Sequence, residues 1–266
     1  MKTDAQLGAL VEAMPPITLE EMAGIRLMKR TDSKFVTNRD RLARLLTLAA
    51  DHYFSQEVAG QRVARYRTVY FDDPERHRFF SMHQCGHKPR TKIRARTYMD
   101  SGDSFLEVKR KNNHGKTSKK RIAIPSIESA TARSEATTFV KECTGLDFSA
   151  FSPTLGNRFQ RITLVNREKT ERLTIDFGLS FDNFETGREA EMPDVVIIEL
   201  KRDGRVPSPV LPLLRQLRIK PSGFSKYCIG SCLTNDGLRQ NRFKKRLVRI
   251  RKAVAADAAS HENKSN

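Results

Sequence analysis

The chain has 266 residues, of which 49 are Lys or Arg and 31 are Asp or Glu, so its formal net charge is +18. This excess predicts a polyanionic partner: a nucleic acid, an anionic membrane surface or a phosphate-rich small molecule. No stretch of about 18 apolar residues occurs, so no transmembrane segment is expected. The first residues lack a basic segment followed by an apolar one, which excludes a typical export signal and predicts a cytoplasmic protein.

The first third of the chain predicts helices separated by short strands. Thr18 and Glu21 form a capping-box pattern, which predicts the start of a helix. Asn38 can cap a second helix, whose leucines recur at the spacing of one buried face. The expected elements are helices over 4–14 and 19–28, a strand over 34–36, the helix after Asn38, a strand over 62–73 and a helix over 74–84.

Residues 90–111 predict a β-hairpin with one cationic face. Successive side chains of a strand point to opposite faces, and both halves of this stretch alternate with period two around a turn over 100–103. The face is either a solvated exterior, where salt screens the repulsion, or a surface for a polyanion on which Glu107 supplies one ligand of a divalent metal ion. Its members are Arg90, Lys92, Arg94 and Arg96 on the first strand and Phe105, Glu107, Lys109 and Lys111 on the second.

The remainder of the chain predicts more strands and a strongly basic C-terminal helix. That helix carries eight Lys and Arg side chains between residues 238 and 254. The expected elements are strands over 119–124, 158–166, 172–179, 194–201 and 224–229, helices over 132–143, 209–217 and 238–254, and a disordered tail over 257–266.

Two of these strands carry the same E-x-K dyad, Glu107 with Lys109 and Glu199 with Lys201, and the alternate residues of both strands are apolar. An antiparallel sheet of about eight strands tends to close into a barrel, because closure removes its edges. The charged faces would then line the lumen, where two like charges ~4 Å apart repel by about 4 kcal/mol. Phosphates, with Mg²⁺ or Mn²⁺ bound by the two glutamates, would relieve that repulsion.

Several short motifs follow one another in a specific order. The hairpin sequence RTKIRARTYMDSGDSFLEVKRK has YFDD before it and SKKRI after it, and IIELK and FSKYCIG come later. Together they resemble the VTC domain of the triphosphate tunnel metalloenzymes, the fold of eukaryotic polyphosphate polymerases and their bacterial relatives. The resemblance covers about residues 25–232. The chain departs from the wider superfamily where E-x-E-x-K is replaced by RTDSK, with Asp32 as the only acid, and it lacks the membrane segments of the eukaryotic subunits.

The resemblance implies an α+β fold: an antiparallel eight-stranded β-barrel, the triphosphate tunnel, with flanking helices. It also implies metal-dependent transfer of a phosphoryl group from ATP to phosphate or polyphosphate. The expected organisation is an N-terminal arm over 1–24, a tunnel domain over 25–236, a basic helix over 237–256 and a disordered tail over 257–266.

The resemblance further implies roles for individual residues, to which the cationic face of the hairpin adds Lys92. Ser225 and Lys226 are expected on the last strand, and Glu107 either binds metal or only orients Lys109. The expected catalytic residues are Lys34, Arg94, Arg96, Lys109, Arg161, Arg172 and Lys226. The expected substrate-binding residues are Lys92, Lys119, Arg121, Lys201 and Ser225. The expected ligands of Mn²⁺ or Mg²⁺ are Glu199 and Glu107.

Four functions stay open at this stage: a polyphosphate polymerase, a hydrolase of triphosphate or short polyphosphates, a non-catalytic polyphosphate-binding module and a nucleic-acid binder. The leading hypothesis is the polymerase, with ATP, phosphate and polyphosphate as partners. A nucleic-acid partner is not expected, because basic nucleic-acid surfaces usually lie on exposed helices or loops and not on strands with an apolar opposite face. No particular oligomeric state is predicted.

Overall fold

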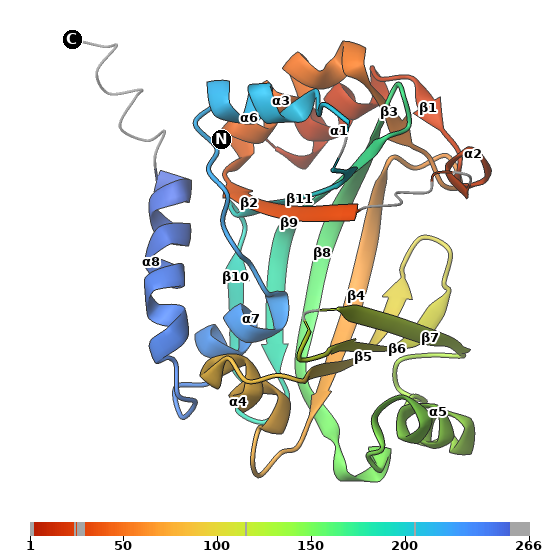
Figure 1. Cartoon of the computed structure of the whole chain (residues 1–266), viewed down its shortest axis with the longest axis vertical. Helices are drawn as coiled ribbons and strands as arrows, with labels where there is room; N and C mark the ends of the chain where they lie inside the picture. The colour runs from red at the N-terminus through yellow and green to blue at the C-terminus, as the bar shows by residue number, and fades with distance from the viewer. Residues whose placement is uncertain (1–2, 24, 26–29, 115, 205, 256–266) are drawn as a thin grey trace.

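One large sheet organises the protein, and helices pack around it (Figure 1). The computed structural model describes residues 3–23, 25, 30–114, 116–204 and 206–255. All strand pairs are antiparallel except β1 with β3, so the expected α+β fold with an antiparallel sheet is confirmed. The strands are β1 (Pro16–Ile17), β2 (Arg30–Thr37), β3 (Tyr53–Gln56), β4 (Val63–Asp72), β5 (Arg90–Tyr98), β6 (Ser104–Lys111), β7 (Thr117–Ile124), β8 (Ser152–Asn166), β9 (Glu171–Asn183), β10 (Glu189–Met192) and β11 (Val196–Asp203).

Eight of these strands form a continuous hydrogen-bonded path in the order β2-β11-β9-β8-β4-β5-β6-β7. In the described part of the chain β2 and β7 end this path without pairing, so the sheet is curled but not closed, in contrast to the expected barrel. Another segment occupies the outer edge of β2. Phe35 forms a bridge with Pro221, and the Ser222 amide donates to the Lys34 carbonyl at 2.8 Å. Backbone groups at the outer edge of β2 therefore form hydrogen bonds with a loop and not with β7.

The cationic hairpin has the register that its alternation predicts. Ile93 lies opposite Val108 and Ala95 opposite Leu106, and all four side chains are buried in the core. Arg94 lies opposite Glu107 on the other face. Strand β7 continues this register. The strand alternation therefore separates an apolar outer face from a charged inner face.

The helices surround the sheet (Figure 1). Asn38 is the N-cap of α3, and its side-chain oxygen accepts from the Arg41 amide at 2.9 Å, as expected. No described helix combines the length and apolar composition that a bilayer crossing requires. The helices are α1 (Asp4–Glu12), α2 (Leu19–Ala23), α3 (Arg39–Ala49), α4 (Arg78–Cys85), α5 (Ser134–Thr144), α6 (Val210–Gln216), α7 (Lys226–Thr234) and α8 (Asn241–Ala255), with short 3₁₀ helices at Ala50–His52 and Phe148–Ala150.

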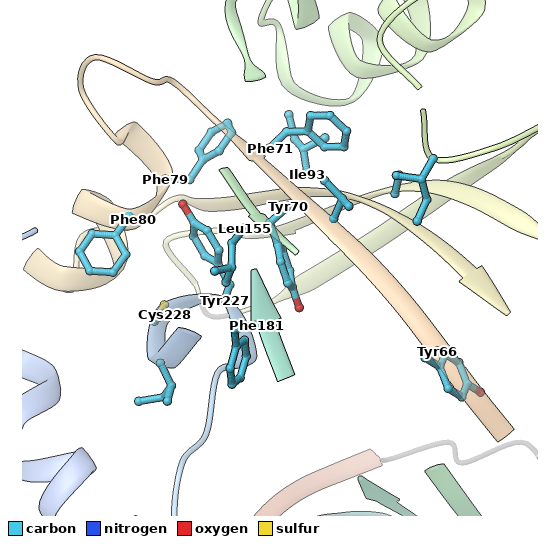
Figure 2. Packing of buried hydrophobic residues seen from close by; sticks show 14 of the residues in the cluster. Tyr66, Tyr70, Phe71, Phe79, Phe80, Ile93, Leu155, Phe181, Tyr227 and Cys228 are labelled. Carbon is cyan, nitrogen blue, oxygen red and sulfur yellow. The ribbon is translucent and has the colours of Figure 1, made fainter. Parts of the chain in front are cut away.

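An aromatic cluster fixes the start of α7 (Figure 2). The Tyr227 ring lies 5.1 Å from that of Tyr70 on β4 and 6.3 Å from that of Phe80 on α4. Its hydroxyl donates to the buried Asp72 carboxylate, which also accepts the amides of Phe79 and Phe80 at 2.8 and 2.9 Å. One carboxylate thus caps α4 and holds α7 against β4.

The expected strand over 224–229 is wrong, because α7 begins there. Ser225 is the N-cap, and its hydroxyl accepts from the Cys228 amide at 3.2 Å. A short apolar run does not distinguish a strand from a buried helix, and here Gly230 allows the helix to approach β8 and β9 closely. The pattern also missed β3 and β10. Part of the expected helix over 19–28 and the expected tail over 257–266 lie outside the described residues.

Gly230→Ala should destabilise the protein by about 1–3 kcal/mol, because the added methyl group would lie 2.8 Å from Leu155 Cδ2 and even closer to the Phe181 ring. Denaturant unfolding measures the difference. Gly8→Ala is the matched control in α1: no heavy atom lies within 4 Å of its added methyl group, so helix propensity should stabilise it by up to about 1 kcal/mol. Equal stability of the two variants would contradict this packing of α7.

Candidate functional site

A cation-lined cavity of about 500 Å³ lies inside the curl of the sheet. All eight strands of the continuous path contribute to it. Among the described residues its lining holds nine Lys and Arg side chains and three carboxylates, so its own acids leave most of the positive charge uncompensated. The lining residues are Asp32, Lys34, Tyr70, Lys92, Arg94, Arg96, Lys109, Thr117, Lys119, Arg161, Asp176, Ile197, Glu199, Lys201, Phe224, Ser225 and Lys226.

The structure brings together most of the residues that the sequence singled out. Eleven of the fourteen line the cavity, and Glu107, Arg121 and Arg172 do not. Arg121 is exposed beyond Lys119 on β7, with its guanidinium 4.3 Å from the centre of the Phe105 ring. Arg172 lies on β9, opposite Lys201 of β11. Their positions make them flanking residues of the cavity.

Glu107 lies beneath the cationic wall instead of on its surface. Its side chain is 1% exposed, Oε2 accepts from Arg94 Nε at 2.6 Å, and Oε1 pairs with Lys119 Nζ. Burial alone would raise the pKa of the Glu107 carboxyl, but Arg94, Arg96 and Lys119 together lower it to about 2. Glu107 therefore holds cations of β5 and β7 in place, and both of its oxygens are already engaged.

A second buried carboxylate, Asp176, organises the opposite wall. Arg161 donates to it through Nε at 2.6 Å and Nη2 at 2.9 Å, and Lys226 Nζ pairs with Oδ2. Burial opposes the charge of Asp176, but Arg161 and then Lys226 hold its pKa well below the usual range. This carboxylate links β8, β9 and the first residue of α7, so it sets the position of both cations.

Stacked aromatic rings support the cations from below. The Tyr66 and Phe159 rings lie 5.0 Å apart at an interplanar angle of 7°. Lys226 Nζ lies 4.0 Å from the Phe159 centroid, and the Arg96 and Arg161 guanidinium carbons lie 5.4 and 5.0 Å from that of Tyr66. Cation–π contacts partly replace the water that these groups lose. The sequence analysis missed these rings, although Phe159 shares its strand parity with Arg161.

Arg96 is the most strongly desolvated arginine of the wall. It is buried, and Nε donates to the Thr68 hydroxyl at 3.2 Å. Burial, followed by the charge of Arg94, lowers the pKa of the Arg96 guanidinium to about 10. Such a group gains more from a bound anion than an exposed arginine does, because water is replaced by a counter-charge.

The lysines gather at the side of the cavity nearest residues 221–225. Lys92 Nζ donates to the Ser225 hydroxyl at 2.9 Å, and Lys34 Nζ donates to the Phe224 carbonyl at 3.4 Å. Lys109 lines the cavity and remains accessible to solvent there. The surrounding protein still removes part of its hydration, and this desolvation, followed by the charge of Lys34, lowers the pKa of the Lys109 ammonium to about 8. Ser225, the N-cap of α7, thus contacts one of the lysines that the strands bring into the cavity.

Glu199 is a carboxylate of the cavity lining that could bind a metal ion. Its side chain is 23% exposed and its oxygens lie 3.2 Å from Lys201 Nζ and 3.6 Å from Lys34 Nζ. Burial would raise the pKa of Glu199, but Lys34 and Lys201 lower it to about 2, so the carboxylate is charged at neutral pH. The described residues contain no group of three His, Cys, Asp or Glu able to hold an ion alone. A divalent ion here would take further oxygens from phosphate and water, as Mg²⁺ commonly does.

An antiparallel sheet curled around a cation-lined cavity defines a protein of the triphosphate tunnel type. The sequence model of the VTC domain family matches residues 29–235, which is more than half of the chain. The chain therefore belongs to the VTC domain family, as the motifs indicated.

The solved structures that match the chain are distant in sequence. A candidate adenylyl cyclase from Hippeastrum, described as having a dominant triphosphatase activity, is 17% identical, with 78% of this chain and 97% of that chain covered and a TM-score of 0.49. A candidate adenylate cyclase from Bacillus halodurans is 12% identical, with 74% and 96% covered and a TM-score of 0.49. A conserved hypothetical protein from Pyrococcus furiosus is 15% identical, with 72% and 91% covered and a TM-score of 0.38. No curated protein matches the chain, and the family assignment rests on the VTC match.

Glu107→Gln should lower the free energy of unfolding at neutral pH by roughly 3 kcal/mol, since the wild-type carboxyl titrates near 2 when folded and near 4.5 when unfolded. A depressed carboxyl pKa stabilises the fold above about pH 4.5, and this stabilisation is lost as the pH falls towards 2. The gap between variant and wild type should therefore shrink in acid. Urea unfolding at pH 7 and pH 3 measures both values.

The matched control is Glu128→Gln, which removes an exposed carboxylate paired with Arg67 outside the cavity. Its effect should stay within about 1 kcal/mol at either pH. A Glu107 variant as stable as this control would show that the cationic wall does not depend on the buried carboxylate.

Proposed function

We propose that this protein is a metal-dependent phosphotransferase that moves the γ-phosphoryl group of ATP onto phosphate or a polyphosphate chain. The observation that supports this most directly is a cavity lined by nine Lys and Arg side chains and only three carboxylates. Such an arrangement is costly when empty and favourable around a compact polyanion. A triphosphate supplies that charge in linear form, so that both walls of the cavity can contact it.

The two buried carboxylates define two sets of phosphate ligands. Arg94 and Lys119 are positioned through Glu107, and Arg161 and Lys226 through Asp176. Arginine forks suit bidentate contacts with phosphate oxygens, whereas lysines supply point charges. In the proposal Arg94, Arg96 and Arg161 grip the transferred phosphoryl group, and the lysines hold the phosphates on either side. Glu107 then acts by positioning Arg94 and Lys119, and the metal role falls to Glu199.

Glu199 would hold Mg²⁺ or Mn²⁺, which would supply positive charge beside the phosphates during transfer. Lys34 and Lys201 beside this carboxylate keep it ionised, which any metal ligand of this type requires. Asp32 also lines the cavity, two residues before Lys34 on β2. The donor set fits an ion that arrives with the nucleotide.

The chemical step needs positioning and charge neutralisation more than proton transfer. A terminal oxygen of the acceptor phosphate forms a bond to the γ-phosphorus of ATP, and the bond from that phosphorus to the β,γ-bridging oxygen breaks, which releases ADP. The acceptor is already an anion, so no general base is required. Transition states of phosphoryl transfer are largely loose, with charge spread over the transferred oxygens, and preorganised arginines stabilise that charge.

The direct test incubates the protein with ATP and Mn²⁺ and follows long chains on a gel together with ADP and phosphate release. Wild type should make chains, and Glu199→Gln should lose at least about 100-fold in rate while remaining folded, because the ion is no longer held. Glu128→Gln, outside the cavity, should match wild type.

Each alternative gives a different result in the same assay. Phosphate release without chains would replace the proposal with a triphosphate or polyphosphate hydrolase. Tight polyphosphate binding without ADP or phosphate release would replace it with a binding module. Full activity of Glu199→Gln would contradict the assigned metal ligand.

A further inference from the structure

A second cavity, of about 690 Å³, adjoins the first and leads outward past residues 221–225. The two cavities share lining residues, among them Lys34, Lys92 and Lys109, so the same cations border both. We call the outer part of the second cavity the mouth. Its distinguishing cations are Arg90 and Lys111 at one end of the β5–β6 hairpin and Arg242, Arg246 and Arg249 on α8, none of which lines the inner cavity.

Helix α8 is fixed beside the mouth by its apolar face. Phe243 and Ile250 are buried, and the Phe243 ring lies 5.7 Å from that of Phe80 on α4. Near the other end of the helix, Asn38 Nδ2 donates to the Val254 carbonyl at 3.0 Å. The packing leaves α8 alongside the sheet near α4 and α7 (Figure 1). A basic helix docked in this way presents its arginines in a defined direction.

Three arginines of α8 recur at the spacing of one helical face, at positions i, i+4 and i+7. A Cβ added to Gly86 would lie 2.6 Å from Arg242 Nη1, and one added to Gly223 would lie 3.8 Å from Arg246 Cζ. The two guanidinium groups therefore lie against backbone that has no side chain, one at the end of α4 and one in the loop along β2. Gly223 lines the mouth, and its lack of a side chain leaves room there for Arg246.

The charge of the mouth is not balanced by the protein. Among the described residues the second cavity is lined by eight Lys and Arg side chains, and its two carboxylates, Asp32 and Glu199, also belong to the inner cavity. His83 adds a buried Nε2 without a hydrogen-bond partner. Burial, followed by Lys92 and Arg90, lowers the pKa of this imidazole to about 3, so it adds no positive charge. The arrangement favours an anion beyond those held inside.

We propose that the mouth is a second phosphate-chain site, which binds the part of a polyphosphate chain that extends beyond the phosphates of the inner cavity. This inference rests on the proposed function, because it takes polyphosphate as the ligand of both adjoining cavities. A nucleic acid fits less well: among the described residues Phe243 is the only Phe, Tyr or Trp that lines the second cavity, and at 2% exposure it offers no platform for a base.

The test measures binding without ATP or metal, by titration calorimetry on the full chain, using tripolyphosphate and long-chain polyphosphate as ligands. Arg246→Gln with Arg249→Gln should weaken binding of the long chain roughly tenfold, because two charged contacts are lost. Tripolyphosphate binding should stay within about twofold, since neither residue lines the inner cavity. The pair Arg90→Gln with Lys111→Gln, on the hairpin side of the mouth, should give the same pattern independently of α8.

The matched control is Lys244→Gln with Arg251→Gln, which removes two exposed charges of α8 that do not line the mouth. It should bind both ligands as wild type does. Equal losses in the mouth and control variants, or a parallel loss of tripolyphosphate binding in the mouth variants, would overturn the inference. Single-stranded DNA bound as tightly as long polyphosphate, and weakened by the same substitutions, would reassign the mouth to nucleic acid. Absence of chain synthesis in the ATP assay would refute only the proposed polymerase activity, because chain binding is measured separately.

Discussion

Repulsion among cations in an enclosed space is the constraint on which the rest of the structure depends. The cavity concentrates nine positive side chains, and each must lose water without being released from its place. Glu107, beneath one wall, and Asp176, within the opposite wall, meet this requirement because each carboxylate joins cations of different elements. The aromatic pair Tyr66 and Phe159 adds a polarisable surface under three of the cations. The cations are thus held rigidly while most of their charge stays available to a ligand.

The same constraint explains why the sheet is apolar outside and charged inside. In the hairpin, Ile93 and Val108 pack into the core, whereas Arg94 and Glu107 face the interior of the curl. Ile93 and Val108 belong to a hydrophobic cluster outside the cavity, whereas α7 begins inside the curl, where Ser225 and Lys226 line the cavity. Any shift of register by one residue would exchange the two faces, placing charges in the core. The fold and the site therefore depend on a single alternation pattern.

Local patterns in the sequence predicted the strands of the hairpin, the cap at Asn38 and the shared charged face of the hairpin, because period two fixes which side chains share a face. The resemblance to the VTC domain, and not a local pattern, indicated the other cavity residues Lys34, Arg161, Ser225 and Lys226. Local patterns did not predict α7, because this helix is buried on all sides and its sequence therefore shows no apolar stripe at helical spacing. Its close packing against β8 and β9 depends on Gly230. The pairing of Asp176 with Lys226 joins residues 50 positions apart, and no local pattern contains that information. The sequence pattern also did not show that the sheet stays open. That depends on the loop at residues 221–222, which binds the outer edge of β2.

Because the described strands β2 and β7 do not pair, the width of the cavity is not determined in the way that it is in a closed barrel. In a closed barrel the number of strands and their stagger determine the diameter. Here the Ser222 amide and the Phe35–Pro221 bridge attach a loop to the outer edge of β2, and this loop can change in length or composition while every strand ladder stays intact. In this fold, therefore, the width of the passage is not set by the number and stagger of the strands alone.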